Sequence, residues 1–240
     1  MNNQALIVVD YQNDFVDPNV WSLYVPWAEN ISWEINNIMY ETKAKWGIII
    51  ASREIHSQWH ISFASNFIWK QSVTVSWINK ESMISYSEIK NWTAQNNWLS
   101  PTAQFTVQEL QAYIQINWDQ VLWPDHCVED TDWSNYFKDL DISLIDKEVI
   151  KWNQIDKHPY SAFEWSEENT NKSLYKLLEE AKTQTLKVVW VATDYCDIAT
   201  VLDWLKKYPV EFIKKASAWV DPSTTLEAIK EMREKGAKVI

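Results

Sequence analysis

Glycine is nearly missing from this sequence of 240 residues, which has 2 Gly and 17 Trp. Globular proteins average about 7% Gly. Some of the Trp residues stand where tight turns favour glycine: Trp27 follows a proline, and Trp92, Trp98 and Trp118 each follow Asn. Bulky side chains disfavour the positive φ of such turns. We therefore hypothesise that most Trp positions other than Trp123 are Gly in the native protein, through a codon read under the wrong genetic code.

Cysteine and long apolar runs are also scarce. Two Cys residues cannot build a disulfide framework, which favours a reducing compartment. No stretch approaches the roughly 20 apolar residues of a membrane span. The first residues, MNNQALIVVD, lack the basic and apolar regions of a secretion signal. We therefore expect a cytoplasmic protein with no membrane partner.

Positive charge is in deficit, with 22 Lys and Arg against 33 Asp and Glu and a net charge of −11. This balance argues against nucleic acid or an anionic membrane surface as a partner. The composition does not decide whether the chain forms a homo-oligomer. The chain is long enough for one substantial domain with its own core.

Apolar segments of strand and helix type alternate along the chain. Strands are predicted at Ala5–Val9, Gly47–Ala51, Leu144–Ile150, Lys187–Ala192, Val210–Lys214 and Lys238–Ile240. Helices are predicted at Ala28–Lys45, Thr106–Ile116, Lys172–Thr183, Cys196–Leu205 and Thr224–Lys235. The alternation predicts an α/β fold: a doubly wound, mostly parallel sheet with helices on both faces. We expect a single domain over 1–240, with residues 68–118 as a surface excursion that has too few apolar residues for its own core.

Four reactive side chains follow the predicted strands. Asp10, Glu54, Lys151 and Cys196 each fall at or just beyond the carboxyl end of a different strand. Ligands of parallel α/β proteins bind at that edge of the sheet. The sequence therefore predicts an active site where these four side chains converge.

Cys196 stands at a predicted strand–turn–helix junction, where a helix N-terminus lowers a thiol pKa and can hold an oxyanion. An acid, an amine and a thiol at one edge form a nucleophilic set, with Asp10 as the base and Lys151 as its charge partner. A buried structural thiol at position 196, and a plain ion pair between Asp10 and Lys151, are the alternatives.

Histidines cluster near Glu54. Residues two apart on a strand point to the same side, so Glu54 and His56 could share one ion, with His60 and His126 as further candidates. Carboxylate and imidazole ligands suit Zn²⁺, with Fe²⁺ and Mn²⁺ as other divalent candidates. Ordinary polar roles for these histidines are the alternative.

Five segments resemble one enzyme family. They are VVDYQNDF at 8–15, REIHSQWHISFASNF at 53–67, LWPDHCVEDT at 122–131, DKHPYSAF at 156–163 and VATDYCDIATVLD at 191–203. Together, in this order, they are similar to the nicotinamidases and pyrazinamidases of the isochorismatase-like cysteine hydrolases. One departure is Glu54, where the family usually has Asp.

The resemblance implies a role for each matched residue. It implies Asp10, Lys151 and Cys196 as a catalytic triad, and the backbone N–H groups of Ala192 and Cys196 as the oxyanion hole. For the metal and the substrate it implies further residues: Glu54, His56 and His126 as ligands, His60 as a contributor in some relatives, and Phe15, Trp123 and Tyr160 around the pyridine ring.

The implied reaction is hydrolysis of nicotinamide to nicotinic acid and ammonia through a cysteine thioester, in NAD salvage. Two alternatives remain at this point. One is a metal-free amidohydrolase of the same superfamily that acts on a carbamoyl or ureido amide. The other is a catalytically inactive member that uses the fold only for binding.

Overall fold

A computed structural model gives the fold of the chain. It describes residues 3–20, 22–70, 82–93, 95, 98–117, 120–152, 166–167, 170–191, 198–219 and 222–240. For residues 116, 117, 151, 152, 190, 198 and 199 the description covers the backbone only. The predicted roles of Tyr160, Ala192 and Cys196 lie outside the described residues.

A six-stranded sheet forms the centre of the molecule. Its strands are β1 (Gln4–Val9), β2 (Ile48–Ile55), β5 (Lys147–Trp152), β6 (Thr185–Val191), β7 (Val210–Ala218) and β8 (Lys238–Val239). They lie in the order β5-β2-β1-β6-β7-β8, and each neighbouring pair is parallel. The predicted α/β class with a mostly parallel sheet is thus confirmed.

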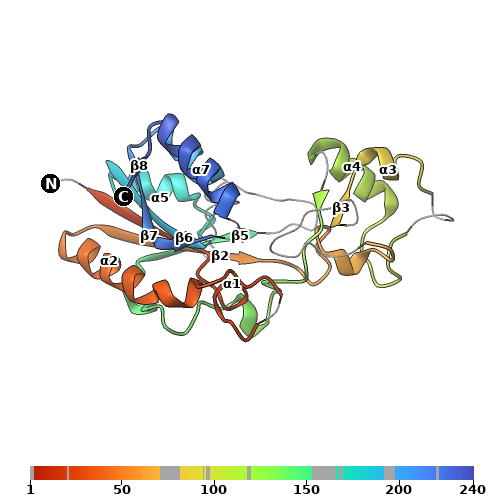
Figure 1. Ribbon diagram of the computed structural model, residues 1–240, viewed down its shortest axis with the longest axis horizontal. Helices are drawn as coiled ribbons and strands as arrows, with labels where there is room; N and C mark the ends of the chain where they lie inside the picture. Colours follow the sequence, from red (N-terminus) through yellow and green to blue (C-terminus); the bar gives the residue numbers. More distant parts are fainter. Residues whose placement is uncertain are drawn as a thin grey trace.

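Helices cover both faces of this sheet. The α-helices are α1 (Asn13–Val16), α2 (Ser32–Ala44), α3 (Tyr86–Ile89), α4 (Val107–Asn117), α5 (Leu174–Glu180), α6 (Ile198–Leu205) and α7 (Pro222–Glu234). Short 3-10 turns are η1 (Ala28–Ile31), η2 (Ala64–Asn66), η4 (Asp132–Ser134) and η5 (Ile142–Leu144). Figure 1 shows α2 on one face and α5 and α7 on the other. Within the described part of the chain, no helix has the length and apolar character that crossing a membrane requires.

The core lies between these layers, with β1 at its centre. Every residue from Ala5 to Val9 is fully buried, because β1 is flanked by β2 and β6 and covered on both sides. Ile35 and Met39, one helical turn apart on α2, are also fully buried against it. This packing fixes the carboxyl ends of β1 and β2 side by side.

Several predicted boundaries were too short. β2 continues past Ala51 to Ile55, and β7 continues past Lys214 to Ala218. In β2 the polar stretch from Ser52 to Glu54 pairs with β5, so ladder hydrogen bonds extend the strand beyond its apolar run. β5 itself ends two residues later than predicted, at Trp152.

A smaller lobe lies to one side of the sheet (Figure 1), and we define it as the described residues between 61 and 122. It contains α3, α4 and an antiparallel pair of short strands, β3 (Met83–Ile84) and β4 (Gln120–Val121). The expectation that this region has too few apolar residues for a core is wrong. A separate apolar cluster fills the lobe, since flanking Ile61 and Leu122 add to buried side chains such as Leu110.

Two Trp residues have a left-handed backbone. Trp27 has φ 69° and ψ 2° after Pro26, and the N–H of Ala28 bonds to the carbonyl of Val25, so the tight turn predicted here is of type II. Trp46 has φ 60° and follows helix α2. Both side chains are exposed, at 73% and 91%. Trp92, in contrast, is not among the described residues with positive φ, so the predicted turn there does not require glycine.

Candidate metal and hydrolase site

Asp10 directly follows β1 and is almost fully buried. Its Oδ1 accepts a hydrogen bond from the Ser52 hydroxyl at 2.7 Å, and its backbone N–H donates to the Ser52 carbonyl at 3.2 Å. Ser52 belongs to the neighbouring strand β2, so the two strands together fix the carboxylate. The residue also takes up an uncommon backbone conformation, with φ 48°. Its role as a base stays a prediction.

Three potential metal ligands meet beside this position. One ligand atom each from Glu54, His56 and His126 lies within 4.8 Å of the other two, and all three residues are buried. The Glu54 Oε1 lies 2.6 Å from His56 Nε2 and 3.9 Å from His126 Nε2. The structure therefore brings together the three residues predicted as ligands, although their role as ligands remains a prediction.

The backbone explains this convergence. Glu54 is the second-last residue of β2, and His56 follows two residues later on the same side. The segment after His126 then runs parallel to His56: the His56 N–H donates to the Cys127 carbonyl at 2.9 Å, and the Glu129 N–H donates to the His56 carbonyl at 2.8 Å. A loop distant in sequence is thus joined to the end of β2.

His126 is oriented by a backbone carbonyl. Its Nδ1 lies 2.7 Å from the Pro124 oxygen, an arrangement that assigns the proton to Nδ1 and leaves the Nε2 lone pair toward Glu54. Burial lowers the pKa of the His126 imidazole, but Glu54, together with the Pro124 carbonyl and the charge of Asp14, raises the pKa above its ordinary value. A proton and a metal cation therefore compete for Nε2 of His126.

The donor set fits a divalent cation. Two imidazole nitrogens and one carboxylate oxygen, with further positions open, are a common set for catalytic zinc. A buried carboxylate such as Glu54 needs positive charge or hydrogen bonds nearby. The described structure gives Glu54 two imidazoles as close partners, and both are metal ligands in their neutral form.

His60 lies next to the cluster without belonging to it. Its ring centroid is 4.6 Å from that of His56, and its Nδ1 lies 2.7 Å from the Ser62 hydroxyl. The group of mutually close ligand atoms among the described residues contains Glu54, His56 and His126 but not His60. His60 thus lies beside the candidate ligands and is not one of the three clustered residues.

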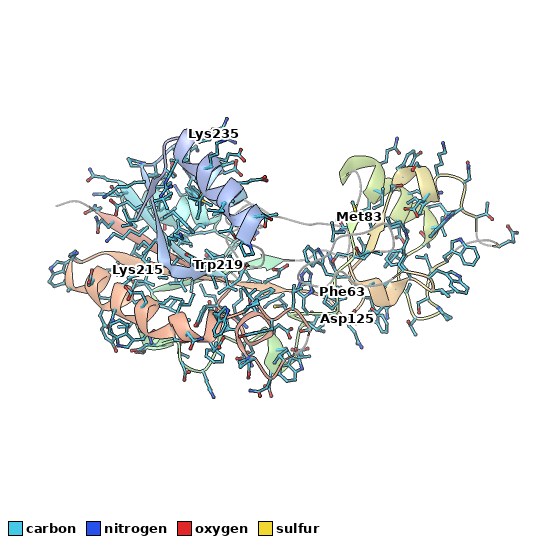
Figure 2. All side chains as sticks on the ribbon, in the orientation of Figure 1. Phe63, Met83, Asp125, Lys215, Trp219 and Lys235 are labelled. Atoms are coloured by element: carbon cyan, nitrogen blue, oxygen red, sulfur yellow. The ribbon has the colours of Figure 1, made fainter. Side chains whose placement is uncertain are left out.

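Aromatic residues surround the histidines. The predicted pocket residue Phe15 has its ring centroid 5.9 Å from that of His126. Trp123 pairs through its backbone with the strand-like segment of Ser62 and Phe63. Phe63, which sequence reasoning missed, is fully buried within 5.8 Å of the rings of all three histidines. Figure 2 shows it at the junction of the sheet and the lobe.

The other predicted catalytic residues are described in part or not at all. The backbone of Lys151 lies on β5 directly opposite Glu54 on β2, and its side chain lies outside the described atoms. β6 pairs with β1 up to Trp190, which aligns its carboxyl end with that of β1. The strands that contain Glu54 and Lys151 and those that precede Asp10 and Cys196 are thus adjacent in the sheet.

Comparison with known proteins gives relatives for the whole chain. No protein-family model matches it. The nicotinamidase of Saccharomyces cerevisiae is 29% identical over 208 residues, 83% of this chain and 80% of the relative. The structure of the yeast nicotinamidase bound to the inhibitor nicotinaldehyde has a TM-score of 0.74 at 26% identity and 99% coverage of both chains. The pyrazinamidase of Pyrococcus horikoshii in complex with zinc has a TM-score of 0.67 at 27% identity, covering 99% of this chain and 98% of its own.

The parallel sheet and its helices define the class: this is the α/β fold of the isochorismatase-like hydrolases. Within that class, the chain is a homologue of the nicotinamidases along nearly its whole length. The family resemblance and the hydrolase class predicted from the sequence motifs are thus confirmed.

Proposed function

We propose that this protein hydrolyses nicotinamide to nicotinic acid and ammonia, as a nicotinamidase of NAD salvage. The observation that carries the proposal is the buried cluster of Glu54, His56 and His126 at the end of the strand next to that of Asp10, in a homologue of nicotinamidases. We take Zn²⁺ as the bound cation, with Fe²⁺ or Mn²⁺ as alternatives, because the donor set suits it and a structural relative is a zinc complex. The proposed compartment is the cytoplasm.

The first half of the reaction forms a thioester. The Asp10 carboxylate takes the proton of the Cys196 thiol, and the sulfur forms a bond to the amide carbon. The carbon–nitrogen bond then breaks, and the nitrogen leaves as ammonia with the proton returned by Asp10. The Lys151 ammonium offsets the negative charges of the carboxylate and the thiolate, and the N–H groups of Ala192 and Cys196 hold the oxyanion.

The second half consumes water. Asp10 takes a proton from the water, and the water oxygen bonds to the carbonyl carbon of the thioester. The carbon–sulfur bond then breaks, and the thiolate recovers a proton from Asp10. Phe15 and Trp123 flank the pyridine ring, and Tyr160 lines the pocket. Glu54, His56 and His126 would hold a cation, which would supply Lewis-acid chemistry to the substrate. The division into two steps lowers the barrier of a difficult amide hydrolysis.

Replacement of the nucleophile tests the proposal. Cys196→Ala is expected to reduce ammonia release from nicotinamide by about 10⁴-fold or more, because no thioester can form. The metal content of the variant, measured by mass spectrometry, is expected to equal that of the wild type, since the thiol is not a ligand.

The outcomes separate the rival functions. Appreciable turnover in Cys196→Ala would contradict the thioester route. A wild-type protein that binds nicotinamide without releasing ammonia would be an inactive binding member. Hydrolysis of carbamoyl or ureido amides that persists in a metal-free preparation, with no activity on nicotinamide, would assign the chain to the metal-free branch.

A further inference from the structure

Gln12 and Asp14 lie between the predicted base and the metal ligands, and neither has a role in the reaction above. We propose that they are positioning residues, which hold the Glu54 and His126 segments at the separation that metal binding requires. This inference rests on the metal site of the proposed function.

Gln12 clamps Glu54 from both sides of its backbone. The Glu54 N–H donates to Gln12 Oε1 at 2.7 Å, and Gln12 Nε2 donates to the Glu54 carbonyl at 2.8 Å. The same Nε2 donates to the carbonyl of Ser134 at 2.8 Å. The partners fix the amide orientation, since a flipped amide would set two carbonyls against an oxygen. One side chain thus ties the end of β2 to the loop that follows His126.

The clamp is fully buried. Gln12 is 0% exposed, so water cannot replace the bonds that its amide makes. Loss of the donor would leave the carbonyls of Glu54 and Ser134 without this partner, in a region where an unpaired polar group is destabilising. These bonds therefore fix the backbone position of Glu54, from which its carboxylate side chain extends.

Asp14 holds the second ligand segment. Its Oδ2 accepts a hydrogen bond from the N–H of Cys127, the residue after His126, at 2.5 Å. Its Oδ1 accepts from the Ser22 hydroxyl at 2.6 Å. Cys127 has φ 46°, an uncommon conformation that requires support from its surroundings. Asp14 is that support on the N–H side.

One short segment therefore touches β2 and the loop that follows His126. Asp10 bonds to Ser52, Gln12 to Glu54 and Asp14 to Cys127. The polar residues at alternate positions of the first motif thus align the carboxyl end of β2 with the loop of His126. Outer-shell residues of this kind commonly change metal affinity about 10- to 100-fold when replaced.

The first test is Gln12→Glu in the full chain, with zinc affinity measured by competition with a chromophoric chelator. The variant keeps the volume and the acceptor for the Glu54 N–H, but places an oxygen against two carbonyls. We expect zinc affinity to fall about 10- to 100-fold and the visible spectrum of the Co²⁺-loaded protein to shift. An added carboxylate would by charge alone strengthen cation binding, so a fall reports geometry.

Asn36→Asp is the matched control. Asn36 clamps a backbone in the same way, donating to the Asp139 carbonyl at 2.8 Å and accepting from the Asp141 N–H at 2.9 Å. We expect this variant to lose stability without a change in zinc affinity or Co²⁺ spectrum. If Gln12→Glu also lowers only the melting temperature, the positioning role is refuted.

A second pair of variants tests the contact between Asp14 and the N–H of Cys127. Asp14→Ala is expected to weaken zinc binding, and Asp14→Asn to restore most of it, because an amide oxygen can still accept from Cys127. Equal zinc affinity in wild type and Asp14→Ala would contradict the proposal for this residue. A wild-type protein that takes up no Zn²⁺ or Co²⁺ would overturn both this inference and the metal site, whereas a normal wild type with unaffected variants overturns this inference alone.

Discussion

At the scale of single residues, the backbone supports the idea that Trp replaces glycine. Trp46 follows α2 as Gly236 follows α7: each lies two residues after the last helical residue, with φ 60° and 103°. Each N–H also bonds to the carbonyl three residues earlier. Lys182 has the same position after α5, so the site tolerates a side chain at a cost. Glycine has no Cβ, so it takes up positive φ at this position without that steric cost.

Trp46→Gly is therefore expected to stabilise the protein by about 1 kcal/mol, because a left-handed residue with a Cβ costs about 1–2 kcal/mol. Trp33→Gly is the control: Trp33 is exposed inside helix α2, where glycine is expected to destabilise. Urea unfolding of both variants measures the difference. Destabilisation by Trp46→Gly would contradict this reasoning, and a mass of 28.4 kDa for protein from its native host would end the glycine hypothesis itself.

At the scale of elements, the sequence predicted the apolar strands well and the polar ones poorly. β1 matched because Ala5–Val9 is buried on both faces. The end of β2 was missed because Arg53 and Glu54 look like loop residues, yet both pair with β5 and Arg53 forms a bidentate ion pair with Glu148. Partners far along the chain decided these boundaries.

The lobe was missed for the same reason. Its apolar residues are spread over more than fifty positions, and the folded lobe, in which β3 pairs with β4, brings them together. Short elements such as α3 begin with local signals, here the capping box of Ser85 and Glu88, but these do not predict which residues will be buried. A separate core was therefore invisible to periodicity in a single segment.

Leu110→Ala tests the apolar cluster of the lobe. Leu110 is fully buried on α4, so the variant is expected to lose about 2–5 kcal/mol of unfolding free energy. Leu226→Ala is the control, because Leu226 is 67% exposed on α7 and its loss should matter little. Denaturant unfolding compares the two, and equal small losses would show that the cluster contributes no core.

At the scale of the whole molecule, the sheet order brings the site together. Four adjacent strands, β5, β2, β1 and β6, point their carboxyl ends to one edge. The sequence predicted Glu54 and His56 as partners from their spacing, with His60 and His126 as further candidates, and the family resemblance favoured His126 over His60. The contact forms through backbone pairing of His56 with Cys127, which no local pattern predicts.

The central claim is that the buried cluster of Glu54, His56 and His126 holds a cation needed for hydrolysis of nicotinamide. Ammonia release from nicotinamide, measured before chelation, after removal of the metal and after addition of Zn²⁺, tests it most directly. We expect loss of activity on chelation and recovery with Zn²⁺ in the wild type, but no recovery in His126→Ala. Undiminished ammonia release from fully metal-free protein would contradict it.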